Sequence, residues 1–345
     1  MNNERFIGTK TTIYLNIQLL RMILSFNILL FHYCSIYDMH SKEIDLLINP
    51  TPFYLATFFI ISFYFSYDLF LSKNIIKIKQ RFFRIMVSFY LWPIISFIFN
   101  NSQYFFLRNT KKIEFKYLLY QIIIGNGFYC LFWFQFNLMF VSIIFVIIIF
   151  LFSKRYLIIF QLIGILCYIF LCSNYYKNIN SNYSEVITFS IRRLPDTFIY
   201  SLTGFYLSSI RYIDIIKKHK KKALCFSFII IYSIKNYEII FKNHPHLSYL
   251  IIEIGALSIF TLFSVFPFDE TKNINLRNSI KFITNFTGGI FYIHPKIIKW
   301  TTISIFQRIH KKILLSSISN YFVCFFICFF CSKLFSKSFL KYLFI

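Results

Sequence analysis

The fold is decided by the first long apolar stretch, Leu15-Asn-Ile-Gln-Leu-Leu-Arg21-Met-Ile-Leu-Ser-Phe-Asn-Ile-Leu-Leu-Phe-His32-Tyr-Cys-Ser-Ile-Tyr37. It is long enough to cross a bilayer as one helix, which takes about 20 apolar residues. Arg21 and His32 are separated by about three helical turns, so they fall on one face, roughly 16 Å apart along the axis. One membrane helix is therefore expected to present a cation and a titratable imidazole on the same side.

Two interpretations of this pair are open. An Arg near the middle of a bilayer costs roughly 2.5–3.5 kcal/mol to insert and usually marks a pathway or a site. Arg21 also lies near the expected cytoplasmic end of the stretch, where its side chain can reach the lipid headgroups without any function. His32 could equally be a hydrogen-bonded packing residue. The chemistry of the two residues alone does not decide between these interpretations.

The composition indicates a polytopic membrane protein. The chain has 345 residues, is 57% hydrophobic, contains 49 Phe and has a mean hydropathy of +0.62. Its net charge of +24 comes from short Lys and Arg blocks between apolar runs, which is the pattern of loops beside anionic lipid. We therefore predict an all-α integral membrane protein whose partner is the lipid bilayer, and no partner among the nucleic acids.

Ten apolar segments predict a single bundle of about ten transmembrane helices. No internal repeat and no linker divides them, so residues 1–345 are expected to form one domain without a separate soluble part. Lys and Arg are more frequent on the segments that face inward when the N-terminus is inside, so both termini are expected on the cytoplasmic side of a cell membrane. The predicted spans are 15–37, 52–72, 85–99, 128–152, 156–172, 194–210, 223–241, 247–268, 282–300 and 313–335.

Several common chemistries lack their motifs in this sequence. There is no phosphate loop, no dinucleotide-binding glycine motif, no zinc-protease HExxH and no plausible pair of carboxylates. Nearly all of the eight cysteines fall inside apolar runs, and the pair Cys328 and Cys331 has no second pair to complete a zinc site. We therefore expect no metal.

Further cations and a second histidine lie at the ends of, or within, the predicted spans. Arg81 and Arg84 are three residues apart where the cytoplasmic segment enters the third helix, and forked guanidiniums there suit a phosphate. The general excess of positive charge on cytoplasmic segments explains them equally well. His294 follows Gly288-Gly289, which permits close helix packing, and precedes Pro295, which frees a backbone carbonyl.

In chain order, these motifs resemble those of the acyltransferase-3 family, integral membrane acyltransferases that modify cell-surface glycans. Arg21-x10-His32 is similar to the family motif of the first helix, and the resemblance covers essentially the whole chain. One departure is Phe63, which stands where the family has glycine and is expected to fill space where the backbone approaches a neighbour or the acyl donor. The other matching stretches are Phe58-Phe-Ile-Ile-Ser62-Phe63-Tyr64, Arg81-x-x-Arg84, Leu131-Phe-Trp133-Phe134 and Phe291-Tyr-Ile-His294-Pro295.

This resemblance implies an O-acyltransferase that moves an acyl group, most commonly acetyl, from cytoplasmic acyl-CoA (acetyl-CoA) to a hydroxyl of a cell-surface or lipid-linked glycan. His32 would be the general base, and Arg21 would orient the donor or stabilise developing negative charge. An acyl-histidine intermediate is an open variant. The implied contacts are those of Arg81, Arg84 and Ser62 with acyl-CoA, and those of Trp133 and His294 with the acceptor.

Two other functions are compatible with the sequence. A translocase could export a lipid-linked glycan or an anion through the same cationic cavity, and Asp68, Asp196, Glu238 and Glu253 lie in or near spans. The absence of a repeat and of an obvious acid pair for a proton relay argues against it. A catalytically inactive relative would suit the Phe63 substitution.

Overall fold

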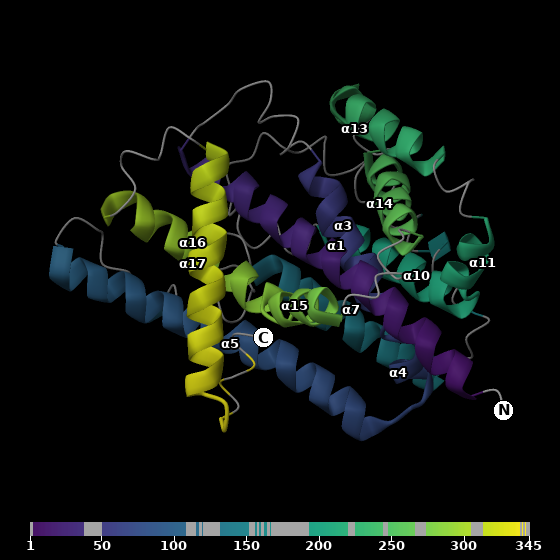
Figure 1. Ribbon diagram of the computed structural model, residues 1–345, viewed down its shortest axis with the longest axis horizontal. Coiled ribbons are helices and arrows are strands. Elements are labelled where there is room, and N and C mark those ends of the chain that lie inside the picture. The colour runs from purple at the N-terminus through teal and green to yellow at the C-terminus, as the bar shows by residue number, and fades with distance from the viewer. Residues whose placement is uncertain are drawn as a thin grey trace. The chain divides into compact units, whose positions relative to one another are not determined.

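The computed structural model confirms that the chain is helical: all regular secondary structure in the residues that it describes is helix (Figure 1). Those residues are 3–37, 50–107, 132–151, 193–219, 225–243, 248–265, 274–304 and 313–338, with single positions or pairs at 115–116, 119, 156, 159, 162–163, 166, 340 and 342. Four segments are long and apolar enough to cross a membrane, namely Leu15–Ser35, Thr51–Leu71, Phe134–Leu151 and Ile313–Leu334. The chain is therefore an integral multi-pass membrane protein.

The described helices belong to two compact units. Unit 1 comprises Met1–Phe65, Tyr200–Phe335 and Phe344–Ile345, and unit 2 comprises Ser66–Ile199 and Ser336–Leu343. Each unit combines segments that are far apart in the sequence. The single-domain organisation expected from the sequence stays a prediction.

Unit 1 is built around α1 (Asn3–Tyr37), because its apolar side chains pack against helices from much later in the chain. Leu20, Leu24 and Ile28 are almost completely buried along it. Its neighbours are α3 (Thr51–Tyr64), α14 (Ser248–Ser264), α15 (Ile274–Thr284), α16 (Thr287–Ser304) and α17 (Ile313–Leu334). Of the other helices of unit 1, α13 (Cys225–Asn243) and α11 (Tyr212–Lys218) pack on α14 (Figure 1).

Glycines set two close helix approaches in unit 1. A Cβ atom on Gly204, in α10 (Leu194–Ser209), would lie 2.2 Å from the backbone oxygen of Ile60 in α3. A Cβ on Gly255 in α14 would lie 2.3 Å from the ring of Phe53 in α3. The sequence led us to expect that Phe63 would fill space at a close backbone approach. Phe63 is fully buried, and the glycine at the close approach to α3 is Gly204 of α10, which faces Ile60. Small residues thus hold α3 between α10 and α14.

Unit 2 contains α4 (Tyr67–Leu71), α5 (Ile75–Leu107) and α7 (Phe132–Leu151), and both α4 and α7 pack on α5. The helix that contains the third predicted span, 85–99, extends beyond it at both ends, because α5 runs from Ile75 to Leu107. Asn74 caps this helix: its side-chain oxygen accepts a hydrogen bond of 3.1 Å from the Lys77 N–H. The basic block before the predicted span is therefore helical.

Three other boundaries differ from the prediction. The helix of the first span starts at Asn3, twelve residues before Leu15, although only Leu15–Ser35 has the hydropathy of a span. The predicted span 52–72 coincides with the candidate span Thr51–Leu71, within which α3 and α4 are separate helices, and the predicted span 282–300 is divided between α15 and α16. The fifth predicted span, 156–172, lies mostly outside the described residues.

None of the cysteines that the structure describes forms a disulfide. Cys34, Cys324 and Cys328 are buried and Cys331 is partly buried, whereas Cys225 at the start of α13 is exposed. Among the described residues there is no group of three or more His, Cys, Asp or Glu side chains that could hold a metal ion.

Candidate functional site

Two histidines from opposite ends of the chain meet in unit 1. His32 lies in α1 and His294 in α16, and their ring centroids are 5.2 Å apart with a 38° angle between the ring planes. His32 is partly buried and His294 is buried, with only 1% of its surface exposed. Phe31 and Phe291 contact the two rings edge to face, with centroid distances of 5.3 and 6.0 Å. The pair therefore sits in largely apolar surroundings.

The His294 ring is held by its own helix. Its Nδ1 atom lies 3.2 Å from the carbonyl oxygen of Ile290, one turn earlier, and the ring also interacts with the backbone of Phe291. Its Nε2 atom is buried and has no hydrogen-bond partner among the described residues. Pro295 lies inside α16 and has no N–H to donate to the Phe291 carbonyl, the usual helical acceptor at that spacing. One nitrogen of this imidazole is thus tethered while the other is left open.

Arg21 lies on the same face of α1 as predicted, and its side chain is exposed and interacts electrostatically with Tyr292 of α16. One turn after Arg21, the Ser25 hydroxyl is 3.1 Å from the hydroxyl of Tyr321 in α17. Ser25 also donates to the Met22 carbonyl at 2.8 Å. The face of α1 between Arg21 and His32 is therefore lined by polar groups from α16 and α17.

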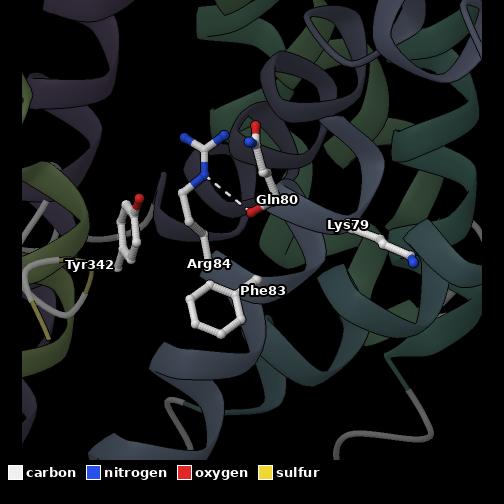
Figure 2. A pocket seen from close by; sticks show the side chains of 5 residues that line it. All are labelled: Lys79, Gln80, Phe83, Arg84 and Tyr342. Carbon is white, nitrogen blue, oxygen red and sulfur yellow. Dashed lines mark hydrogen bonds between the residues drawn. The ribbon is translucent and has the colours of Figure 1, made fainter. Parts of the chain in front are cut away.

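Arg84 lines a cavity of about 550 Å³ in unit 2, together with Lys79, Gln80, Phe83 and Tyr342 (Figure 2). The Nε atom of Arg84 donates to the Gln80 carbonyl at 3.4 Å, and Figure 2 shows its side chain between Gln80 and Tyr342. The ring of Tyr342 meets that of Phe83 edge to face at 6.2 Å, and the Tyr342 carbonyl accepts a hydrogen bond from Ser88 at 3.4 Å. The cavity thus combines a guanidinium with two aromatic rings.

Arg81 behaves differently from Arg84, although both lie in α5. Its guanidinium lies over the ring of Phe70 in α4, 5.6 Å from the ring centroid, and its side chain is partly buried. Burial and the neighbouring charge of Arg84 lower the pKa of Arg81 to about 10, so it is still a cation at neutral pH. Arg81 is not among the described residues that line the cavity.

The remaining predicted site residues lie on other helices. Ser62 is partly buried in α3 of unit 1, next to the buried Phe63. Trp133 is in the first turn of α7 in unit 2, and its side chain lies outside the described residues, as does Leu131 of the same motif. Within unit 1 the structure therefore brings His32 and His294 together, and Arg21 lies about three turns from His32 on the same helix.

A partly buried carboxyl group lies elsewhere in unit 1. Glu253 of α14 accepts a hydrogen bond from the Thr203 hydroxyl of α10. Eight residues further along α14, the Thr261 hydroxyl is 2.9 Å from that of Tyr212 in α11. These contacts join α14 to α10 and α11 through polar side chains.

Sequence reasoning missed four residues that line or support these sites. Ser25 could have been found from its spacing, because it lies four residues after Arg21 on the same helical face. Tyr292 lies two residues before His294 within the motif already recognised. Tyr321 and Tyr342 belong to apolar stretches without any local signal, and only the tertiary structure brings them to Ser25 and Phe83.

Comparison with known proteins adds no assignment to this geometry. The chain matches no family model, no curated protein and no solved structure. Any function must therefore be argued from the arrangement of the chain's own residues.

Proposed function

We propose that this protein is a membrane-embedded O-acyltransferase, which moves an acyl group, acetyl in the first instance, from cytoplasmic acyl-CoA to a hydroxyl of a cell-surface or lipid-linked glycan. The single observation that carries the proposal is the meeting of His32 and His294, with ring centroids 5.2 Å apart. The two imidazoles would supply a base, and α1, which carries His32, also carries the cation of Arg21.

The chemistry of the reaction explains why such a site would be useful. An alcohol is a poor nucleophile at neutral pH, and a positioned histidine that removes its proton typically contributes about 10²–10⁴-fold to the rate. In the proposed reaction His32 takes the proton of the acceptor hydroxyl while the oxygen attacks the thioester carbonyl. Arg21 lies about three turns from His32 on the same helix and would orient the donor through its positive charge.

The donor would be held by its phosphates. Arg84 suits this role, because its cavity offers a guanidinium beside the rings of Phe83 and Tyr342, and Arg binds phosphate oxygens through paired N–H groups. Arg81 lies over Phe70, and its positive charge near the start of α5 would add to that of Arg84 in attracting the phosphates of the donor. Ser62 is assigned to the donor, and Trp133 to the acceptor, by the resemblance of their motifs alone.

The finer topology is part of the same proposal. A bundle of about ten spans in one domain, with both termini in the cytoplasm of a cell with a glycan-bearing surface, would place the basic block of α5 beside acyl-CoA. The histidine pair would then be reached by an acceptor from the outer side.

Acyl transfer by the purified protein tests the proposal. The protein in nanodiscs would receive radiolabelled acetyl-CoA and a lipid-linked glycan extract, with His32→Ala and Arg21→Ala in parallel. His219→Ala is the matched control, because His219 is exposed at the end of α11. We expect label on the glycan with wild type and with the control, and a loss of about 10²-fold or more in His32→Ala.

The other outcomes identify the competing functions. Binding of acetyl-CoA without transfer to any glycan would indicate an inactive relative. Neither binding nor transfer would favour a translocase, for which the membrane carboxyl of Glu253, hydrogen-bonded to Thr203, is the first residue to substitute in transport assays. Equal transfer by wild type and His32→Ala would contradict the proposed role of the histidine pair.

A further inference from the structure

The start of α5 lies where two candidate membrane spans end. The span Thr51–Leu71 stops four residues before α5 begins at Ile75. The span Phe134–Leu151 ends beside the same place, because the Nζ atom of Lys73 lies 5.4 Å from the ring centroid of Phe150. The first turns of α5 are therefore at the depth of the lipid headgroups.

One face of these turns is apolar and yet exposed. Ile76, Phe83 and Met86 follow one another at spacings of seven and three residues, which places them on one side of the helix. Their exposed fractions are 70%, 48% and 42%. Large apolar side chains at the boundary between headgroups and acyl chains insert among the lipids. This face of α5 therefore suits the acyl chains of a lipid.

Positive charges flank the apolar face. The stretch from residue 73 to residue 84 carries five basic side chains and no acidic one. Lys79 follows Ile76 by one turn, Arg84 follows Phe83 directly, and both cations are exposed. A Lys or Arg at the membrane surface attracts anionic lipid by about 1 kcal/mol. The charge of this stretch is thus complementary to an anionic headgroup.

The cavity lined by Arg84 gives this attraction a defined site. Its volume of about 550 Å³ is within the range of small-molecule pockets, about 300–1,000 Å³. The Nε atom of Arg84 donates to the Gln80 carbonyl at 3.4 Å, and the two terminal nitrogens have no partner among the described residues. Figure 2 shows the side-chain amide of Gln80 beside this guanidinium. The guanidinium can therefore bind phosphate oxygens in pairs, and the amide can bond to a headgroup hydroxyl.

The C-terminal segment forms the opposite wall of the cavity. The ring of Tyr342 meets that of Phe83 edge to face at 6.2 Å, and its carbonyl accepts a hydrogen bond from Ser88 at 3.4 Å. Tyrosine is enriched at membrane interfaces, where its ring and its hydroxyl meet different surroundings. This wall makes the site a cavity with a definite shape, which a flat basic surface would not be.

We propose that this cavity binds the phosphate of an anionic phospholipid, whose acyl chains run along the exposed face of Ile76, Phe83 and Met86. The lipid site goes beyond the proposed acyl transfer, because it requires no reaction. It uses the same chemistry as the proposed donor site, since phospholipid and acyl-CoA both present a phosphate to Arg84. Anionic lipid should therefore compete with acyl-CoA, and this expectation alone rests on the proposed function.

Native mass spectrometry of the full-length protein in detergent tests the lipid site. The protein is titrated with phosphatidylglycerol or with phosphatidylcholine, whose choline neutralises the phosphate, and the fraction of protein that carries one lipid is measured. We expect phosphatidylglycerol to saturate one site with an affinity at least about 5-fold higher than that of phosphatidylcholine. Arg84→Ala should lower the affinity for phosphatidylglycerol by about 10-fold or more, whereas Arg84→Lys should retain part of it.

Lys77→Ala is the matched control for charge. Lys77 is exposed on the same helix and is not among the described residues that line the cavity. A diffuse positive surface would lose equal affinity in Lys77→Ala and in Arg84→Ala, so equal losses would overturn the proposal. Equal affinities of wild type for the two lipids would overturn it as well.

The free headgroup distinguishes a lipid from a soluble phosphate. Glycerophosphoglycerol, which lacks acyl chains, should bind at least about 10²-fold more weakly than phosphatidylglycerol. Met86→Ser should lower the affinity for the intact lipid and leave that for the headgroup unchanged. If the headgroup displaces the lipid at equal concentration, the ligand is a soluble phosphate and the lipid assignment is wrong.

Acetyl-CoA separates this inference from the proposed function. If both are correct, acetyl-CoA displaces phosphatidylglycerol from wild type. Binding of phosphatidylglycerol that acetyl-CoA does not displace would support the lipid site and contradict the donor site. Binding of acetyl-CoA without any preference for phosphatidylglycerol would overturn the lipid site and leave the donor site standing.

Discussion

The substitution Gly204→Ala tests the packing that surrounds the site. The new Cβ would lie 2.2 Å from the carbonyl oxygen of Ile60 and 2.9 Å from its carbonyl carbon and Cα. All three atoms belong to the backbone of α3, so no side-chain rotation can relieve the clash, and α10 and α3 must separate by roughly 1 Å. Such overpacking costs typically about 1–3 kcal/mol. At 2 kcal/mol the unfolding equilibrium shifts by about 30-fold.

The assay is reversible unfolding in bicelles, with the free energy of unfolding as the measured quantity. Ser208→Ala, one turn further along α10 at a partly exposed position, should change it by less than about 0.5 kcal/mol. Truncating the facing side chain in Gly204→Ala/Ile60→Ala should restore nothing, because the clash is with backbone. In contrast, Gly255→Ala clashes with the Phe53 ring, so adding Phe53→Leu should recover part of its loss. Wild-type stability of Gly204→Ala would refute this account of the helix contact.

Three further outcomes are expected from the described contacts. Under the proposed function, Arg84→Ala should weaken acetyl-CoA binding by about 10-fold or more, because loss of a charge-assisted hydrogen bond costs about 1.5–3 kcal/mol. Arg81→Ala should instead mainly lower the free energy of unfolding. Equal losses of acetyl-CoA binding in a titration of the two variants would contradict the different surroundings of Arg81 and Arg84. Thr203→Val removes the hydrogen-bond donor to Glu253 and should lower the free energy of unfolding by about 1–3 kcal/mol. In a protein that already carries Glu253→Leu, the same substitution should not have this cost. Burial raises the pKa of Tyr212, and its hydrogen bond with Thr261 lowers it by a smaller amount. The folded state therefore favours the neutral phenol, so the free energy of unfolding should fall as the pH rises above about 10. This fall should be smaller in Tyr212→Phe.

The helical class and the membrane location could be predicted because they depend on local properties. Length and hydropathy identify Leu15–Ser35 and Ile313–Leu334 as spans without any tertiary information. The common face of Arg21 and Ser25 follows from helical spacing alone. Helix ends were less predictable from hydropathy, because the cap at Asn74 starts α5 inside the basic block, where no apolar run exists.

The contacts that define the site could not be predicted in the same way. His32 and His294 are more than 250 residues apart, and their meeting depends on how α16 packs on α1. Arg81 and Arg84 share a helix, yet the ring of Phe70 engages only Arg81. Sequence patterns therefore named residues with the required chemistry, while long-range packing decides which of them act together.

The exposed thiol of Cys225 offers a native handle on the orientation of this protein. It lies three residues after Lys222, the end of a basic run, and among the described cysteines it contrasts with the buried Cys34, Cys324 and Cys328. A charged maleimide that cannot cross a bilayer reacts with accessible thiols only. Comparing the labelling of wild type with that of Cys225→Ser, in intact and in permeabilised cells, would therefore report the side of the membrane on which α13 begins.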